Sequence, residues 1–287
     1  METYIIAEIG CNHKGDFAIA KEMVKIAKSF CDVDKVKFQK RNPVELLTQR
    51  EYYAPHPDPH HSYGETYGKH REALEFSLEQ HRTLMEYCRE LNIEYSCSVW
   101  DITSAKEIVS LNPQSIKIPS ATNLNNVVVD YLCENYGGEI HVSLGMTTKR
   151  EEESIIDRFI QNKRNRDVVI YSCVSGYPVS FEDLSLLEIR RLVEKYTTIV
   201  KAIGFSGHHL GIAADIAALT LGARYFERHF TLDRTLKGTD HAASLEPDGM
   251  RRIVRDIRNV SKALTYKEKD ILECEKVQRR KLKREVS

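Results

Sequence analysis

The chain has 287 residues, of which 41% are hydrophobic and 29% charged, so it can bury a large core as one long domain or two short ones. Lysine plus arginine and aspartate plus glutamate both number 42, which excludes an overall field that would favour nucleic acid or an anionic membrane. Seven cysteines without a metal-type CxxC pair, and an N-terminus with neither a basic nor a long apolar segment, predict a reduced, cytoplasmic protein with no membrane span.

Short runs of β-branched or aromatic residues recur along the chain and predict strands. They cover residues 4–10, 35–39, 94–100, 115–120, 140–145, 168–173, 202–207 and 224–230. Amphipathic stretches with helical periodicity alternate with them, at 16–30, 77–91, 148–162, 180–196, 211–223 and 244–265. Alternating strands and helices indicate a parallel sheet, and eight such units indicate an α/β fold of the closed (β/α)8 TIM-barrel type.

The main alternative fold is a doubly wound sheet, which would need a glycine-rich phosphate turn after its first strand. The segment "GCNHKG" (10–15) matches the GxGxxG pattern poorly, so the barrel is preferred. We expect the barrel to span residues 1–265. The remaining segment, 266–287, is highly charged and lacks a long apolar stripe, which predicts a linker or docking arm.

Polar residues gather where the predicted strands end, and functional groups of a (β/α)8 barrel lie at the carboxyl ends of its strands. We expect the following residues to converge on one mouth: Asn12, His13, Lys37, Gln39, Ser98, Lys117, Ser120, Ser143, Ser175, Ser206, His208, Glu227 and His229. Taken singly, most would be helix caps or solvated side chains. Lys37 and Lys117, however, lie in the apolar runs "VKFQ" and "IKIP", where a lysine is costly unless it faces a polar cavity.

These residue types point to two kinds of chemistry. The lysines and serine hydroxyls suit a small, highly charged anion, such as a phosphate ester that carries a carboxylate. His208 and His229, on neighbouring strands, are candidate neutral ligands of a divalent metal, although ordinary hydrogen-bonded histidines fit the spacing equally well and His209 and His241 lie nearby. Glu227 points to the same face of its strand as His229, where it can orient a ligand or hold a lysine.

Eight segments resemble, in order, those of the sialic acid synthases, most closely the animal-type branch. They are AEIGCNHKGD (7–16), VKFQK (36–40), YGETYGKHREALEFS (63–77), IKIPSATN (116–123), VSLGM (142–146), CVSGYP (173–178), GFSGHHLGIA (204–213) and ERHFTLDRTLKGTDHAASLEP (227–247). The resemblance implies a transferase that condenses phosphoenolpyruvate with N-acetylmannosamine, its 6-phosphate or a related aldose. The products would be a nonulosonic acid, which is a nine-carbon 2-keto acid, and phosphate. It also implies a divalent metal, Mn²⁺ or Mg²⁺, and a homodimer.

The resemblance assigns roles position by position. Phosphoenolpyruvate contacts fall on Lys37, Lys117, Ser98, Ser120, Ser143, Ser175 and Ser206, metal ligands on His208 and His229, and groups around the sugar on Gln39, Tyr177 and Asp240. The enol carbon of the substrate is the nucleophile, so no covalent nucleophile is needed from the protein. The metal would polarise the aldehyde while the lysines fix the phosphate and carboxylate. We expect Glu227 to manage a proton or to position the water that adds to C2 before phosphate leaves by C–O cleavage.

The chain also departs from the family pattern. Thr122, in "PSAT", replaces an acid that usually faces the sugar, and Lys14 stands where bacterial members often carry Glu, so the acceptor stays open. The Pro- and His-rich segment 54–68 predicts either an active-site lid or, equally, a mobile surface loop. Relatives usually continue into a small C-terminal antifreeze-like domain, which is absent here. We expect either a barrel fragment of a longer protein or a chain that closes its acceptor pocket with other groups.

The sequence leaves two other functions open. One is a phosphoenolpyruvate-sugar condensing enzyme of the 3-deoxy-aldulosonate type, which the segments "SGHHLGIA" and "KGTDHAASLEP" argue against. The other is a non-catalytic barrel that binds a sugar or a phosphate. A site that had lost its catalytic function would have no physical reason to keep groups that are costly to bury. The chain keeps four of them: Lys37, Lys117, His208 and His229.

Overall fold

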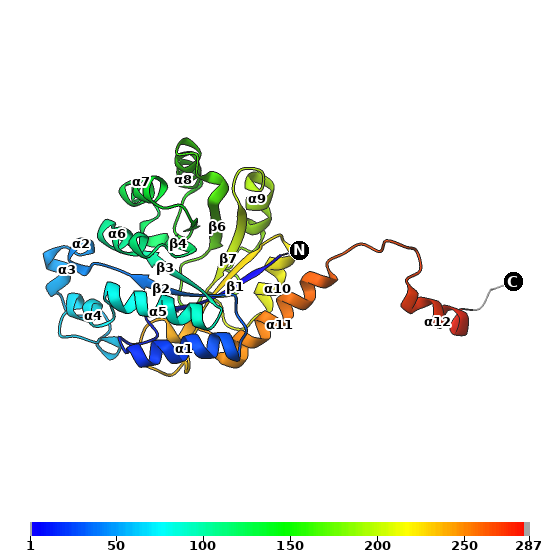
Figure 1. The fold of residues 1–287 in the computed structure, drawn as a ribbon, viewed down its shortest axis with the longest axis horizontal. Helices are drawn as coiled ribbons and strands as arrows, with labels where there is room; N and C mark the ends of the chain where they lie inside the picture. Colours follow the sequence, from blue (N-terminus) through cyan, green and yellow to red (C-terminus); the bar gives the residue numbers. More distant parts are fainter. Residues whose placement is uncertain (1, 284–287) are drawn as a thin grey trace.

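A closed barrel of eight parallel strands forms the centre of the computed structural model, which describes residues 2–283 (Figure 1). The strands are β1 Tyr4–Gly10, β2 Lys35–Lys40, β3 Glu94–Val99, β4 Ser115–Ile118, β5 Glu139–Ser143, β6 Val168–Cys173, β7 Ala202–Gly207 and β8 Tyr225–His229. Each strand pairs with the next one in the chain, and β8 pairs with β1. The (β/α)8 prediction is confirmed.

Helices surround this barrel. They are α1 Phe17–Ser29, α5 Leu78–Glu90, α6 Ile102–Leu111, α7 Asn126–Asn135, α8 Lys149–Gln161, α9 Leu187–Tyr196, α10 Ala213–Thr220 and α11 Pro247–Ala263. Three short helices, α2 Pro43–Leu46, α3 Gln49–Tyr53 and α4 Tyr67–Ala73, lie in the long connection between β2 and α5, and 3-10 turns occur at Pro59–His61, Ser120–Thr122, Asn165–Asp167 and His241–Ala243. Helices α2, α3, α4, α6 and α7 were not predicted. The first three are too short for a clear apolar stripe.

Helix α9 begins later than residue 180, where its apolar periodicity starts. Ser185 has a φ of +49°, a left-handed conformation that an α-helix cannot contain. Before it, the backbone N–H of Asp183 donates to Oγ of Ser180 at 3.3 Å, and this local bond closes a turn instead. The helix therefore starts at Leu187, after the left-handed residue.

The alternation of side chains along each strand separates two environments. Outward-facing residues pack against the helices and are mainly apolar, for example Ile5, Ala7 and Ile9 on β1 and Val36 and Phe38 on β2, all of them buried. Each of the larger of these side chains, such as Ile5 or Phe38, contributes roughly 1.5–3 kcal/mol when it is fully buried. Inward-facing residues are largely polar, and they include Glu8, Lys35, Lys37, Ser96, Ser98, Ser115, Lys117, His141, Ser143, Ser206, Glu227 and His229. This polar interior is what the fold offers for function.

The chain after α11 lies apart from the barrel (Figure 1). Helix α12, Glu273–Leu282, buries none of its residues. The division into a barrel over 1–265 and an arm over 266–287 stays a prediction, and residues 1 and 284–287 of these two parts lie outside the described residues. Across residues 2–283, no helix combines the length and the apolar character needed to cross a membrane.

Candidate active site

A cavity of about 760 Å³ opens at the carboxyl ends of the strands. Every residue that the sequence analysis assigned to substrate, metal or catalysis lines it: Lys37, Gln39, Ser98, Lys117, Ser120, Ser143, Ser175, Tyr177, Ser206, His208, Glu227, His229 and Asp240. These residues come from six of the eight strands and from the loops after β4, β6, β7 and β8. The structure thus brings these residues, and Asn12 with them, to one mouth, while their roles stay predictions.

Three histidines near the mouth serve the fold instead. The ring of His13 stacks on Phe76 with 4.1 Å between centroids, and it does not line the cavity, so this part of the prediction was wrong. His209 is fully buried with its Nε2 3.1 Å from Arg228, and His241 bonds Thr231 through Nδ1 at 2.7 Å. His209 and His241 are therefore held by other side chains outside the cavity wall.

The floor of the cavity is a cluster of buried charges. Nζ of Lys37 donates to Oγ of Ser98 at 2.7 Å and lies 2.5 Å from Oε2 of Glu8. Oε1 of Glu227 lies 2.7 Å from Nζ of Lys117 and 3.6 Å from Nζ of Lys37. Glu8 was not predicted, although it lies in the apolar run of β1 as Lys37 lies in that of β2. The same argument from a costly buried charge would have found it.

Burial and pairing give these groups different protonation behaviour. Burial raises the pKa of Glu8 to about 7, against the opposing pull of Lys37. Burial also acts to raise the pKa of Glu227, but Lys117 and Lys37 outweigh it and hold that pKa well below its usual range. Burial lowers the pKa of Lys117. Glu227 is therefore the firmly ionised carboxylate, and the floor carries net positive charge whenever Glu8 is protonated.

Serine hydroxyls gather beside this floor around Gly145. Oγ of Ser120 donates to Oγ of Ser143 at 2.7 Å, whereas the buried Oγ of Ser175 has no hydrogen-bond partner among the described residues. A Cβ added to Gly145 would lie 2.4 Å from Oγ of Ser175 and 2.6 Å from Oγ of Ser120. Glycine is thus needed at residue 145 to leave room for these hydroxyls, which can donate to an anion.

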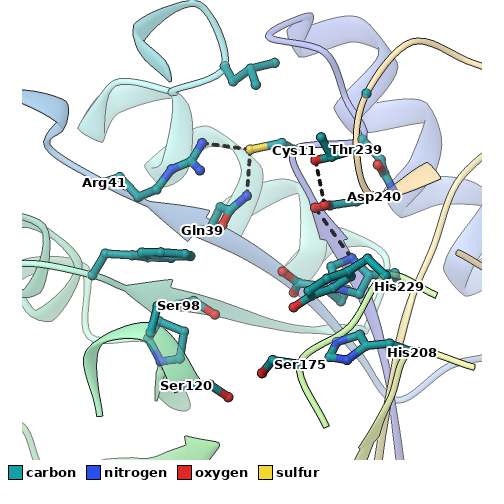
Figure 2. Close-up of a pocket in the computed structure, with 18 of the residues that line it drawn as sticks. Cys11, Gln39, Arg41, Ser98, Ser120, Ser175, His208, His229, Thr239 and Asp240 are labelled. Atoms are coloured by element: carbon teal, nitrogen blue, oxygen red, sulfur yellow. Dashed lines mark hydrogen bonds and ion pairs between the residues drawn. The ribbon is translucent and has the colours of Figure 1, made fainter. Parts of the chain in front are cut away.

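His208 and His229 lie near each other on one side of the cavity, with 5.3 Å between their ring centroids and 47° between their ring planes (Figure 2). Nδ1 of His208 lies 2.9 Å from the carbonyl oxygen of Val174, so Nδ1 carries the hydrogen and Nε2 is left free. Burial lowers the pKa of His229 to about 4, which keeps this ring neutral at pH 7. Oδ2 of Asp240 lies 3.8 Å from Nδ1 of His229.

Imidazoles with free nitrogens fit a divalent transition metal. Burial acts to lower the pKa of His208, but Cys173 and the carbonyl of Val174 outweigh it and raise that pKa, so a metal would compete with a proton for this ring. A carbonyl that holds the second nitrogen of a ligand histidine, as Val174 holds His208, is a usual second-shell arrangement at such sites. Among residues 2–283, no third histidine, cysteine, aspartate or glutamate completes a metal-binding group. A metal held by His208 and His229 would take its other ligands from substrate or solvent.

A second network, around Cys11, borders the far side of the cavity (Figure 2). The sulfur of Cys11 accepts hydrogen bonds from Nε2 of Gln39 at 2.6 Å and from Nη2 of Arg41 at 2.9 Å. Arg41 also forms an ion pair with Glu75. Cys11 and Arg41 were not predicted, because the spacing of a lone cysteine and an arginine carries no signal of its own. Together these contacts fix the amide of Gln39, which faces the cavity.

The segment 54–68 forms part of the cavity wall. His56, His61 and Tyr63 line the cavity, and the hydroxyl of Tyr63 donates to the carbonyl oxygen of Lys237. The backbone N–H of Gly238 donates to Nδ1 of His61 at 2.9 Å. The segment therefore packs against the loop that follows β8, as a lid would, and two of its histidines, His56 and His61, line the cavity, whereas His60 is exposed.

Comparison with known proteins gives one family. Residues 23–269 match the NeuB family. Human N-acetylneuraminate-9-phosphate synthase is 36% identical over 283 residues, which cover 99% of this chain and 77% of the human one. N,N'-diacetyllegionaminic acid synthase of Legionella pneumophila is 33% identical over 94% of this chain and 75% of its own. The crystal structure of N-acetylneuraminic acid synthetase from Leptospira borgpetersenii, in complex with citrate, superposes with a TM-score of 0.82 at 26% identity over 99% of this chain and 94% of that one.

Proposed function

The chain belongs to the NeuB family, a family of synthases, and from this premise we propose that it condenses phosphoenolpyruvate with an aldose of the N-acetylmannosamine type. The products would be a nonulosonic acid and inorganic phosphate. The observation that carries the proposal is the cavity floor, where Lys37 and Lys117 are buried beside the serine hydroxyls around Gly145. Phosphoenolpyruvate has one carboxylate and one phosphate, which match two ammonium groups and a set of hydroxyl donors.

Each residue of the floor would have a distinct task. Lys37 and Lys117 would bind the two anionic groups, while Glu227 keeps both lysines charged and in place. Oε2 of Glu227 is buried without a hydrogen-bond partner among the described residues, so it is available to accept from a water molecule. His208 and His229 would hold the divalent metal, Mn²⁺ or Mg²⁺, which when bound polarises the open-chain aldehyde.

The reaction balances with these groups. C3 of phosphoenolpyruvate forms a bond to C1 of the aldose, and water adds to the C2 that becomes electron-poor. The C–O bond between C2 and the phosphate then breaks. One proton of the water ends on the former aldehyde oxygen and the other on phosphate. We assign Glu227, which lies beside both lysines, to the positioning of that water and to the transfer of its proton.

Arg71 supports a phosphorylated acceptor. Its guanidinium lines the cavity and lies over the rings of Tyr67 and Trp100, at 5.0 and 5.7 Å from their centroids. Nη2 donates to the hydroxyl of Tyr67 at 2.6 Å, and across the described chain no carboxylate lies within ion-pairing distance of Arg71. By contrast, Arg41 is neutralised by Glu75. An unpaired, stacked arginine suits a phosphate monoester, so we propose the 6-phosphate of N-acetylmannosamine as the preferred acceptor.

The test is release of phosphate from phosphoenolpyruvate with Mn²⁺ across a panel of aldoses. We expect the highest kcat/KM with N-acetylmannosamine 6-phosphate, and we expect Arg71→Leu to lose the preference for the phosphorylated sugar. Arg50→Leu, at an exposed arginine outside the cavity, should keep it. Turnover only with arabinose 5-phosphate would favour the 3-deoxy-aldulosonate alternative. Phosphoenolpyruvate binding without turnover on any aldose would favour the non-catalytic barrel.

We also propose that the protein forms a homodimer, that it is cytoplasmic and that a charged arm follows its barrel. None of them enters the chemistry above, because every group named there comes from one chain between Glu8 and Asp240.

A further inference from the structure

Lys117 lies between a carboxylate and an aromatic ring. Its Nζ is 2.7 Å from Oε1 of Glu227 on one side and 4.4 Å from the ring centroid of Tyr171 on the other. An ammonium group over a ring face is attracted by the electrons of the ring, most strongly where water is excluded. Lys117 and Tyr171 are both buried, so this condition holds. The other floor lysine, Lys37, has a hydroxyl and carboxylates around it and no ring contact of this kind.

The ring of Tyr171 is itself fixed from below. Its hydroxyl lies 2.8 Å from Nδ1 of His141, and Nε2 of His141 lies 3.2 Å from Oε2 of Glu139. Burial lowers the pKa of His141 to about 4, so the ring is neutral at pH 7. Since the carboxylate of Glu139 can only accept, Nε2 carries the hydrogen, and Nδ1 accepts from the hydroxyl of Tyr171. Three side chains are thus locked in series beneath Lys117.

The neighbouring strand leaves room for this ring at a glycine. Gly204 on β7 pairs with Tyr171 on β6, and a Cβ added to Gly204 would lie 2.6 Å from two ring carbons of Tyr171. Any other residue at 204 would therefore push the ring out of its place. Tyr171 is fully buried, so a displaced ring could shift only within the barrel interior, where it contacts Lys117.

We propose that Tyr171 is a positioning residue for phosphoenolpyruvate, which holds the ammonium group of Lys117 at the cavity floor through its ring face. The chain from Glu139 through His141 to Tyr171 anchors that ring. The proposal rests on the proposed function, because it takes Lys117 as a phosphoenolpyruvate contact. Tyr171 does not line the cavity and touches no substrate; it acts through Lys117.

The chain contains a matched control. Tyr95 on β3 is also a buried tyrosine whose hydroxyl bonds a buried histidine, His81, at 2.6 Å, but it contacts neither floor lysine. Leu and Phe substitutions at residues 95 and 171 remove the same atoms from two buried rings, of which Tyr95 packs in the core between strands and helices and Tyr171 lies inside the barrel. Effects of lost packing should therefore appear in both series, and effects on Lys117 only in the series at 171.

The experiment is calorimetric titration of all four variants with phosphoenolpyruvate, together with the KM for each substrate. We expect Tyr171→Leu to bind phosphoenolpyruvate about tenfold more weakly, as the loss of a buried cation–π contact implies, with the KM for the sugar unchanged. Tyr171→Phe keeps the ring face and should stay within about threefold of the natural protein. Tyr95→Leu and Tyr95→Phe should lower the melting temperature and leave phosphoenolpyruvate affinity unchanged.

Several results would overturn the proposal. Unchanged affinity in Tyr171→Leu would do so, as would equal losses in Tyr171→Phe and Tyr171→Leu, or equal losses in the series at 95 and 171. If Tyr171→Leu does not fold, Gly204→Ala displaces the ring without removing it, and a folded Gly204→Ala protein with natural affinity contradicts the proposal. If the natural protein itself does not bind phosphoenolpyruvate, the proposed function fails first and the role of Tyr171 fails with it.

Discussion

Both ends of the barrel interior contain buried polar residues, but the two ends differ in which polar atoms lack a hydrogen-bond partner. In the upper part, at the carboxyl ends of the strands, Oε2 of Glu227, Oγ of Ser175 and Nδ1 of His229 are buried without hydrogen-bond partners. In the lower part, Lys35 donates to Ser115 at 2.7 Å and lies 3.1 Å from the carboxylate of Glu94.

The lower part contains Lys35, Glu94, Ser96, Ser115, Glu139, His141 and Tyr171. Within the described part of the chain, none of these residues has a buried side-chain nitrogen or oxygen without a partner. Buried polar groups in native proteins are nearly always paired, so the unpaired atoms of the upper part, which line the cavity, support the proposal that a ligand completes their bonding there. Unpaired atoms of His81 and Asp215 lie outside the cavity and carry no such implication. Burial of charge alone does not mark function, because Lys35 is as deeply buried as Lys37.

The largest expected effect lies in the upper part, at the histidine pair. His208→Ala and His229→Ala should each reduce metal-dependent turnover to background, because each removes one of only two candidate protein ligands. The melting temperature should change little, since both rings line a cavity instead of filling the core. Steady-state kinetics over a range of Mn²⁺ concentrations measures this, with His60→Ala, an exposed histidine outside the cavity, as control. Full activity of His208→Ala at ordinary metal concentration would end the assignment.

A smaller effect is expected in the lower part, as a pH dependence of stability. Burial lowers the pKa of His141 from 6.5 to about 4, so the unfolded chain binds a proton at this residue between these values while the folded one does not. The contribution of His141 to the free energy of unfolding should therefore be complete above pH 6.5 and be lost as the pH falls toward 4.

Denaturant titrations at pH 4.5, 5.5, 6.5 and 7.5 would measure this contribution. His141→Gln should be less stable than the natural protein at pH 7.5 and should show a shallower loss toward pH 4.5, because no imidazole titrates at residue 141. Identical pH slopes for the two proteins would show that His141 does not contribute in this way.

The fold was predictable from the sequence because its signal repeats. Each strand of the barrel has an apolar outer face, so short β-branched runs recur at 4–10, 35–39 and 168–173 and coincide closely with β1, β2 and β6. The helix boundaries were less predictable. Ser185 adopts a left-handed conformation that delays α9, and nothing in its residue type distinguishes it from a helical serine.

The cavity-lining set was predictable for a related reason: polar residues at strand ends stand out against apolar neighbours. The pairing among them was not. Glu8 contacts Lys37 across neighbouring strands, and Arg71 reaches the cavity from a short helix more than thirty residues after Lys37 in the chain. Contacts between residues distant in sequence depend on barrel closure and strand register, which the periodicity of a single segment does not encode.

The most direct test of the contrast between the two parts uses three lysines. Lys37→Met, Lys117→Met and Lys35→Met would each be titrated with phosphoenolpyruvate by calorimetry and unfolded with denaturant. We predict that Lys37→Met and Lys117→Met lose roughly 2–5 kcal/mol of phosphoenolpyruvate binding free energy, as expected when one partner of a buried charged contact is removed. Lys35→Met should bind phosphoenolpyruvate as the natural protein does and lose about 1–3 kcal/mol of unfolding free energy. Unchanged phosphoenolpyruvate affinity in Lys37→Met and Lys117→Met, or an equal loss in Lys35→Met, would contradict the account.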